Sequence, residues 1–264
     1  IMNIDHSNSH SSFKDKVSMS NLCQEITLPT TPIKSIDDPE GEIALCILSA
    51  INVGAIGNLN ELESLCDLSV RALDEIIELQ DYPVKAAEVS TKSRRSLGIG
   101  YIGLAHYLAK NGVKYSDPKA WELVDRLSEA FQYYLLRASC DIAEEKGKCE
   151  YFDRTKYADG LLPIDHYKKE VDEIVPHKQR MAWESLRKDI AKYGLRHSTL
   201  SAQMPSESSS VVSNETNGIE PPRALMSIKK SKKGPLKQIA PGFPKLKNDY
   251  TLLWDMPDNQ GYIN

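Results

Sequence analysis

The sequence lacks the segments that would place it in a membrane or send it through a secretory pathway. No apolar run approaches the roughly 18 residues that a membrane-spanning helix needs. No basic segment followed by an apolar one opens the chain. These absences predict a protein with no membrane partner, and a cytoplasmic location is the default expectation.

Cysteines are few, and their spacing pairs none of them. The chain has five in 264 residues, without any Cys-x-x-Cys pair. We therefore expect neither a disulfide framework nor a zinc site built on paired cysteines. Each cysteine is either a small buried hydrophobic residue or a reactive thiol. The five are Cys23, Cys46, Cys66, Cys140 and Cys149.

The sequence also has no strong excess of one charge. It carries 33 basic and 37 acidic residues, for a net charge of -4, which argues against a nucleic-acid partner. The histidines offer no metal site either. His6 and His10 lie near Asp5, but the segment has no helical character and no further ligand cluster accompanies them.

Short extended runs alternate with longer helical segments. Residues 43–51 form a nearly continuous apolar run, typical of a parallel strand that is buried on both faces. Residues 21–29, 96–100 and 196–204 also favour an extended conformation. The alternation predicts an α/β protein with parallel strands.

Four segments carry apolar residues at helical spacing, and a hairpin follows them. We expect the hairpin at residues 224–235, with a solvated turn rich in lysine. The first helix has a predicted buried stripe of Leu62, Leu65, Leu68, Ala72, Leu73 and Ile76. Two further helices are expected at residues 102–110 and at 178–192, where Trp183, Leu186 and Ile190 face inward and Gly194 ends the helix. A long helix that starts near residue 117 lies between them, and its apolar face is predicted to consist of Val124, Leu127, Phe131, Leu135 and Ala138.

An amide, a thiol and a carboxylate occur at alternating positions near the start of the chain. In an extended segment, Asn21, Cys23 and Glu25 would project from the same side. Together they would form a possible reaction centre. An ordinary polar edge strand would have the same pattern, so the spacing alone leaves both interpretations open.

A serine-rich segment after residue 204 offers hydroxyl groups and backbone N–H groups ahead of an expected helix or turn. That arrangement suits a phosphate, and an ordinary helix N-cap fits it about as well. Cys46, inside the apolar run, is likewise either a core residue or a redox thiol. The serine-rich segment consists of Pro205, Ser206, Glu207, Ser208 and Ser209.

Gly98, Gly100 and Gly103 have the spacing of a dinucleotide-binding loop. The residues before them make a poor hydrophobic strand, and the acidic residue expected about 20 positions later is missing. We interpret these glycines as a requirement of tight packing between a strand and a helix. A nicotinamide-dependent dehydrogenase is therefore a distant alternative.

Several motifs in a fixed order resemble one family, the large subunit of class I (aerobic) ribonucleotide reductases. The resemblance runs essentially from end to end of the chain and matches the catalytic barrel of that subunit. Its motifs are Ser20–Ile26, Ile43–Cys46, Trp183–Leu186, Gly194–Ser198, Ala202–Ser209 and Asn217–Arg223.

The resemblance implies a ten-stranded α/β barrel made of two antiparallel five-stranded halves, with a finger loop through its centre. The chain would form a single partial barrel domain over residues 1–264. The finger loop would span about 14–32, the second half-barrel about 41–223, and a hairpin with a C-terminal segment about 224–264.

The resemblance also implies a role for each candidate residue in reducing ribonucleotides to deoxyribonucleotides. Cys23 would be the thiyl radical that abstracts the 3′ hydrogen, Glu25 the general base, and Asn21 a substrate-orienting amide. Cys46 would be one of two thiols that supply the reducing equivalents. Residues 205–209 would hold the substrate diphosphate.

The partners implied by the resemblance lie outside this chain. They are a ribonucleoside diphosphate, a metal-containing small subunit that supplies the radical, and thioredoxin or glutaredoxin as electron donor. No cofactor is expected on the chain itself. The second redox cysteine and the radical-transferring tyrosines are expected in segments before and after it, and Tyr133 and Tyr134 do not fit that role.

We therefore expect a fragment of a large subunit that is inactive alone. It would be either one piece of a naturally split subunit or a truncated gene product. The competing expectation is a catalytically inactive fragment or assembly partner that has kept the fold.

Overall fold

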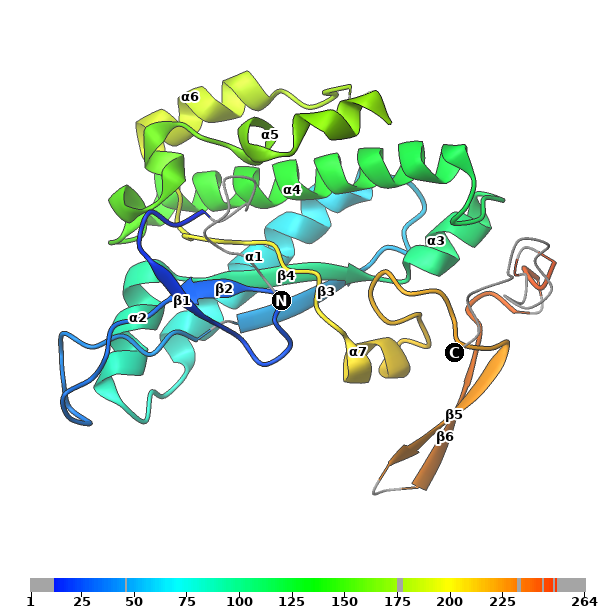
Figure 1. Cartoon of the computed structure of the whole chain (residues 1–264), viewed down its shortest axis with the longest axis horizontal. Helices are drawn as coiled ribbons and strands as arrows, with labels where there is room; N and C mark the ends of the chain where they lie inside the picture. The colour runs from blue at the N-terminus through cyan, green and yellow to red at the C-terminus, as the bar shows by residue number, and fades with distance from the viewer. Residues whose placement is uncertain are drawn as a thin grey trace. The chain divides into compact units, whose positions relative to one another are not determined.

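The computed structural model describes residues 12–45, 47–174, 178–231, 234–243, 245–248 and 250. The chain divides into two compact units. The first comprises Ile1–Ile51, Asn58–Gly100 and Asp125–Met204, and the second Asn52–Gly57, Tyr101–Val124 and Pro205–Asn264. Helices and strands both contribute to the fold (Figure 1), so the predicted α/β class is confirmed.

The described strands pair in three two-stranded sheets, β1 with β2, β3 with β4, and β5 with β6. The strands are β1 (Val17–Ser20), β2 (Thr27–Pro29), β3 (Ile47–Asn52), β4 (Leu97–Ile102), β5 (Met226–Ser231) and β6 (Gly234–Ile239). The α-helices are α1 (Glu61–Leu79), α2 (Lys85–Arg94), α3 (Leu104–Lys110), α4 (Pro118–Lys146), α5 (Pro163–His166), α6 (Trp183–Tyr193) and α7 (Glu207–Val212). Short 3-10 helices cover Phe152–Arg154, Lys156–Asp159 and Lys169–Glu173.

Helix α1 buries only part of the predicted face. Leu62 and Leu73 are buried as predicted. Leu68 and Ile76, expected inside, are 65% and 43% exposed. The helix is rotated because the carboxylate of Asp74, only 1% exposed, faces the interior and meets buried cations there. The residues that α1 buries are Leu62, Cys66, Val70, Leu73, Asp74 and Ile77.

Strand β3 is shorter and less buried than predicted. It begins at Ile47, and of its six residues only Ile51 is buried. Leu48 is 45% exposed. The expectation of burial on both faces is therefore wrong, since four of the six residues are half-buried and one is exposed.

Strand β4 explains the glycine pattern of residues 98–103. All six residues of β4 are buried, and Gly98 and Gly100 lie inside the strand. The segment after α6 hydrogen-bonds along it, from Ile99 N to Leu200 O at 2.7 Å and from Ala202 N to Ile99 O at 3.0 Å. A Cβ on Gly100 would lie 2.3 Å from the carbonyl oxygen of Ala202.

Gly100 is therefore needed for close approach between extended segments, and not between a strand and a helix as we expected. Gly103, with φ of 80°, ends the strand, and α3 starts at Leu104 instead of at residue 102. The predicted end at Lys110 is confirmed. Two glycines within a strand leave no loop of the kind that cradles a dinucleotide phosphate.

Helices α4 and α6 match their predicted apolar faces. In α4 the predicted residues Leu127, Phe131, Leu135 and Ala138 are buried and Val124 is half-buried. Helix α6 buries Trp183, Leu186 and Ile190. Figure 1 shows α6 above α4, and the indole Nε1 of Trp183 donates to Glu129 of α4 at 3.0 Å. Helix α6 starts at 183, later than the predicted 178. Glu129 accepts the backbone N–H groups of Arg180 and Met181, which holds that segment outside a helix.

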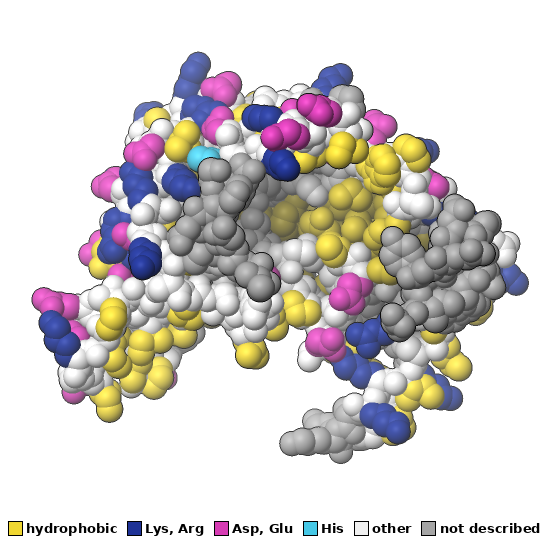
Figure 2. All heavy atoms as spheres, viewed as in Figure 1, with side chains coloured by type: hydrophobic (Ala, Val, Ile, Leu, Met, Phe, Trp, Pro, Cys, Tyr) yellow, Lys and Arg dark blue, Asp and Glu magenta, His cyan; other side chains and the backbone are white. Residues whose placement is uncertain are grey.

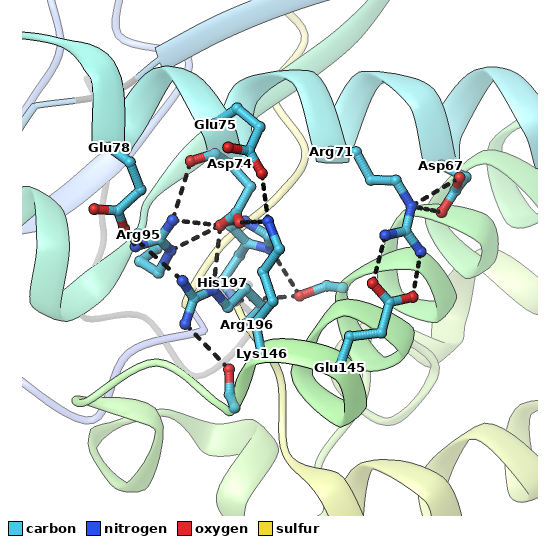
Figure 3. A network of polar contacts seen from close by, with 12 residues as sticks. Asp67, Arg71, Asp74, Glu75, Glu78, Arg95, Glu145, Lys146, Arg196 and His197 are labelled. Atoms are coloured by element: carbon cyan, nitrogen blue, oxygen red, sulfur yellow. Dashed lines mark hydrogen bonds and ion pairs between the residues drawn. The ribbon is translucent and has the colours of Figure 1, made fainter.

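A network of charged side chains joins the helices of the first unit around Asp74 (Figure 3). Arg95 donates to its Oδ1 from Nε at 2.8 Å, and Arg196 does so at 3.2 Å. The Nε2 atom of His197 lies 3.1 Å from the same oxygen. Lys146 lies 3.4 Å from Oδ2. One carboxylate thus connects α1 to the end of α2, the end of α4 and the segment after α6.

In the second unit, β5 and β6 form the predicted hairpin. They pair antiparallel from Met226–Ile239 to Ser231–Gly234, so the hairpin continues four residues past the predicted end. Two of the predicted turn lysines, at positions 232 and 233, lie outside the described residues. None of the described helices is both long and apolar enough to cross a membrane.

Candidate active site

The segment that carries Cys23 is the turn of a β-hairpin in the first unit. Strands β1 and β2 pair antiparallel, with Ser20 opposite Thr27. Residues 21–26 close the hairpin through a hydrogen bond from Asn21 N to Ile26 O at 3.1 Å. Gln24 has φ of 63°, in the left-handed region. The expected extended conformation is therefore confirmed over 27–29, which form β2, and wrong over 21–26, where the Asn21 side chain stabilises a compact turn.

Asn21 and Glu25 contact each other across this turn. The Asn21 amide donates from Nδ2 to Oε1 of Glu25 and accepts the backbone N–H of Ile26 at 3.1 Å. The second carboxylate oxygen of Glu25, Oε2, is buried and has no hydrogen-bond partner among the described residues. Leaving a buried acceptor unsatisfied is unfavourable by about 1–3 kcal/mol. This oxygen is therefore available to a donor that the described part of the chain does not supply.

Cys23 differs from the other described cysteines in its exposure. It lies exposed in the turn, whereas Cys66, Cys140 and Cys149 are buried. Burial raises the pKa of those three thiols to about 12, 11 and 12, respectively. Since the thiolate is the reactive form, the three buried cysteines are chemically quiet. Sequence alone left that distinction open.

Two sequence-based candidates cannot be placed. Cys46 lies outside the described residues, immediately before β3. The pair His6 and His10 also lies outside them. Among the described residues, no three His, Cys, Asp or Glu side chains come together as a possible metal site.

The serine-rich segment begins helix α7 in the second unit. Ser206 occupies the N-cap position, but its side chain makes no capping hydrogen bond. Its Oγ is buried and has no partner among the described residues. The hydroxyl is thus free for another acceptor or donor, which is unusual for an ordinary serine N-cap. Ser208 and Ser209 are exposed.

Glu207 is the charged member of this segment, and its side chain interacts with the hairpin of the second unit. It forms an ion pair with Lys229 of β5 and accepts from Asn217 Nδ2 at 3.4 Å. These residues line a cavity of about 310 Å³ with Arg223 and Lys230. The sequence assigned the lysines to a solvated turn and missed this neighbourhood, because only the folded hairpin brings β5 to α7.

The second unit also contains a buried carboxylate that the sequence did not single out. Glu215 is 4% exposed, and its Oε1 lies 2.7 Å from Nδ1 of His106 on α3. A Cβ on Gly54 or Gly103 would lie 2.8 Å from the Glu215 carboxylate. Packing around Glu215 therefore requires both glycines. The Cys23 turn and the serine-rich segment belong to different units.

Comparison with known proteins identifies the family. The model of the ribonucleotide reductase barrel domain matches residues 1–258. The chain belongs to this family. It is 58% identical to the ribonucleoside-diphosphate reductase subunit alpha of Haemophilus influenzae, and 58% to that of Buchnera aphidicola subsp. Schizaphis graminum. It is 54% identical to the ribonucleoside-diphosphate reductase 1 subunit alpha of Escherichia coli.

Each of these alignments covers 100% of the chain but only 35% of the relative. The chain thus spans about a third of the length of the curated relatives it matches. Membership confirms the resemblance inferred from the ordered motifs. It also accounts for the Asn-x-Cys-x-Glu turn and the serine-rich segment as parts of a reductase barrel domain.

Proposed function

We propose that this chain supplies the radical-bearing turn and part of the substrate site for reduction of ribonucleoside diphosphates. The observation that carries the proposal is the turn itself. It presents an exposed thiol at Cys23, two residues before Glu25, whose carboxylate has a second oxygen without a partner among the described residues. The strands of the chain would form part of the ten-stranded barrel of the complete large subunit.

The proposed chemistry begins at Cys23. As a thiyl radical it takes the hydrogen atom from C3′ of the ribose, so an S–H bond forms and the carbon becomes the radical. Glu25 accepts the proton of the 3′ hydroxyl through the free Oε2 atom. Asn21 fixes the Glu25 carboxylate through Oε1, which leaves Oε2 for the substrate.

The 2′ hydroxyl then leaves as water. Two thiols, Cys46 and a partner from another part of the subunit, supply two electrons and two protons and end as a disulfide. Cys23 finally returns its hydrogen atom to C3′ and becomes a radical again. The balance is one ribonucleotide and two thiols converted into one deoxyribonucleotide, one water and one disulfide.

The remaining participants lie outside the chain. A metal-containing small subunit would generate the radical, and thioredoxin or glutaredoxin would reduce the disulfide. The substrate diphosphate would bind the hydroxyls and backbone N–H groups of residues 206–209, where Ser206 Oγ is unpartnered among the described residues. The relatives are named for diphosphate substrates, which favours a diphosphate here.

A chimaeric large subunit tests this proposal. The matching stretch of the Haemophilus influenzae subunit alpha is replaced by this chain, and the chimaera is assayed with the Haemophilus influenzae small subunit for reduction of cytidine diphosphate. We expect turnover, and we expect Glu25→Gln to lower kcat because the amide cannot accept the 3′ proton. An inactive but folded chimaera that still binds the small subunit would instead favour an assembly partner without catalytic activity.

A further inference from the structure

Two carboxylates mark the two ends of the hairpin that carries Cys23. Asp15 precedes β1 by two residues. Glu42 pairs with Thr31, which follows β2 by two residues, through hydrogen bonds from Thr31 N to Glu42 O at 3.2 Å and from Glu42 N to Thr31 O at 3.0 Å. The Thr31 hydroxyl also donates to Glu42 Oε1 at 3.3 Å. Movement of either carboxylate would therefore move one end of the hairpin.

A single guanidinium binds both carboxylates. Arg94 donates to Glu42 from Nε at 2.5 Å and from Nη2 at 3.0 Å. From Nη1 it donates to Asp15 at 2.8 Å. The paired contact with Glu42 uses the fork geometry that only arginine offers, and the third nitrogen reaches the other end of the hairpin.

The surroundings of Arg94 make this interaction strong and specific. Arg94 is 2% exposed and Glu42 is 4% exposed, so water screens the pair weakly. The guanidinium carbon lies 5.1 Å from the centre of the Tyr151 ring and 5.8 Å from that of Phe13. Arg154, which is 40% exposed, binds Asp15 as well, from Nε at 2.8 Å, and its Nη2 lies 3.7 Å from Glu42 Oε1, beyond hydrogen-bond distance. Both carboxylates are thus neutralised within a mostly buried cluster.

Apolar packing alone would hold the hairpin less precisely. Apolar residues of the hairpin belong to a small buried cluster, which consists of Phe13, Val17, Ile26, Leu28, Ala44 and Ala202. Such packing is non-directional and allows small shifts, whereas the three hydrogen bonds of Arg94 fix direction as well as distance. A radical that must abstract one chosen hydrogen needs that precision, since a misplacement near 1 Å lowers rates by about a hundredfold.

We propose that Arg94 is a positioning residue, which holds both ends of the hairpin and so fixes Cys23 relative to its substrate. The inference rests on the proposed reductase function for its catalytic consequence. The structural part, that Arg94 restrains residues 17–29, stands independently of that function.

The next residue in the chain provides a matched control. Arg95 is also buried, at 3% exposure, and it also binds carboxylates, those of Asp74 and Glu78 on α1. None of its hydrogen bonds or ion pairs in the described part of the chain reaches the hairpin. Lysine at either position keeps the charge but removes the fork, so a comparison of Arg94→Lys with Arg95→Lys separates positioning from general loss of a buried arginine.

The experiment measures both consequences in the chimaeric large subunit. Hydrogen–deuterium exchange of the peptide that spans residues 17–29 reports on the hairpin, and steady-state kinetics report on catalysis. We expect Arg94→Lys to raise exchange at least about fivefold and to lower kcat at least about tenfold, with KM changed less than about twofold. Arg95→Lys should leave exchange in that peptide and kcat close to those of the parent.

Equal effects of the two substitutions, or no change in exchange with Arg94→Lys, would overturn the proposal. If Arg94→Lys does not fold, Asp15→Asn is the substitute variant, because it weakens the ion pair of Arg94 with Asp15 at a half-buried site. It should raise exchange and lower kcat to a smaller extent than Arg94→Lys. Unchanged exchange with Asp15→Asn would then refute the proposal. If the parent chimaera is inactive, the reductase function fails, while the exchange data still decide whether Arg94 restrains the hairpin.

Discussion

The carboxylate of Asp74 and the imidazole of His197 form a buried pair in which both ring nitrogens of His197 have a partner. Nε2 lies 3.1 Å from Asp74 Oδ1, and Nδ1 lies 2.9 Å from the hydroxyl of Ser139. That hydroxyl also accepts the backbone N–H of His197 at 3.1 Å, so it is free to donate its own hydrogen to Nδ1. One neutral tautomer, with the proton on Nε2, therefore satisfies every contact.

The fully buried His197 makes stability depend on pH. Burial lowers its pKa from 6.5 to about 4, against the opposing effect of Asp74. Because the unfolded chain binds the proton at higher pH, stability is complete above 6.5 and falls as pH drops from 6.5 toward 4. The loss from His197 should reach about 3 kcal/mol at the acid end. Urea unfolding at pH 7, 6, 5 and 4.5 measures it.

A substitution at His197 isolates that contribution. His197→Asn keeps an acceptor near Ser139 but cannot be protonated, so the chain should be less stable at pH 7 and should lose less stability between pH 6.5 and 4.5. Asp74 contributes little in that window, because its pKa lies well below the usual range: burial opposes this shift, but hydrogen bonds from His197 and Arg95 outweigh it. An unchanged pH slope in His197→Asn would contradict the assignment.

Glu129 of α4 fixes the start of α6. Its Oε1 accepts hydrogen bonds from Arg180 N at 2.7 Å, Met181 N at 3.1 Å and Trp183 Nε1 at 3.0 Å. We expect Glu129→Ala to lower the free energy of unfolding by about 3 kcal/mol, since it leaves one buried indole N–H and two partly buried backbone N–H groups without an acceptor. Glu144→Ala, at an exposed position of the same helix, should change it by less than about 0.5 kcal/mol. Similar losses for both would show that Glu129 has no special role.

Exposed apolar side chains predict that the chain by itself associates. On α1, Leu68 and Leu79 are 65% and 81% exposed, and Leu48 of β3 is 45% exposed. Figure 2 shows further apolar side chains gathered at the lower left of the view. Such apolar surface favours association.

Light scattering coupled to gel filtration measures that association. We expect oligomers whose mass rises with concentration, and less association in the double variant Leu68→Lys with Leu79→Lys. Ser64→Lys, at an exposed polar position of the same helix, adds charge without removing apolar surface and should have little effect. A monodisperse monomer at all concentrations would contradict the prediction.

The sequence predicted best those elements whose apolar pattern is undisturbed by buried charge. Helices α4 and α6 bury the expected faces, and the hairpin β5–β6 forms around the expected turn. For helix α1 the apolar pattern predicted the buried face only in part, because Asp74 is buried there. Hydrophobic periodicity cannot predict a carboxylate on the interior face of a helix. The buried arginines Arg94 and Arg95 were missed for the same reason.

The residues of the candidate site could be predicted from the sequence, but the backbone conformation that carries them could not. The family motifs identified Asn21, Cys23 and Glu25, yet the alternation suggested an extended segment where the structure has a turn. The turn depends on the side-chain contacts of Asn21 with Glu25 and with Ile26 N, which spacing cannot reveal. The exposure of Cys23 and the burial of Cys66 likewise follow from tertiary packing.

The most direct test of the central claim compares two cysteines in the chimaeric large subunit. Cys23→Ser removes the exposed thiol. Cys66→Ser is the matched control, because it makes the same substitution at a buried cysteine. Formation of deoxycytidine diphosphate is measured for each variant under conditions where the parent is active. We predict that Cys23→Ser abolishes product formation while Cys66→Ser retains it. Product formation by Cys23→Ser at the rate of the parent would contradict the assignment of Cys23 as the radical site.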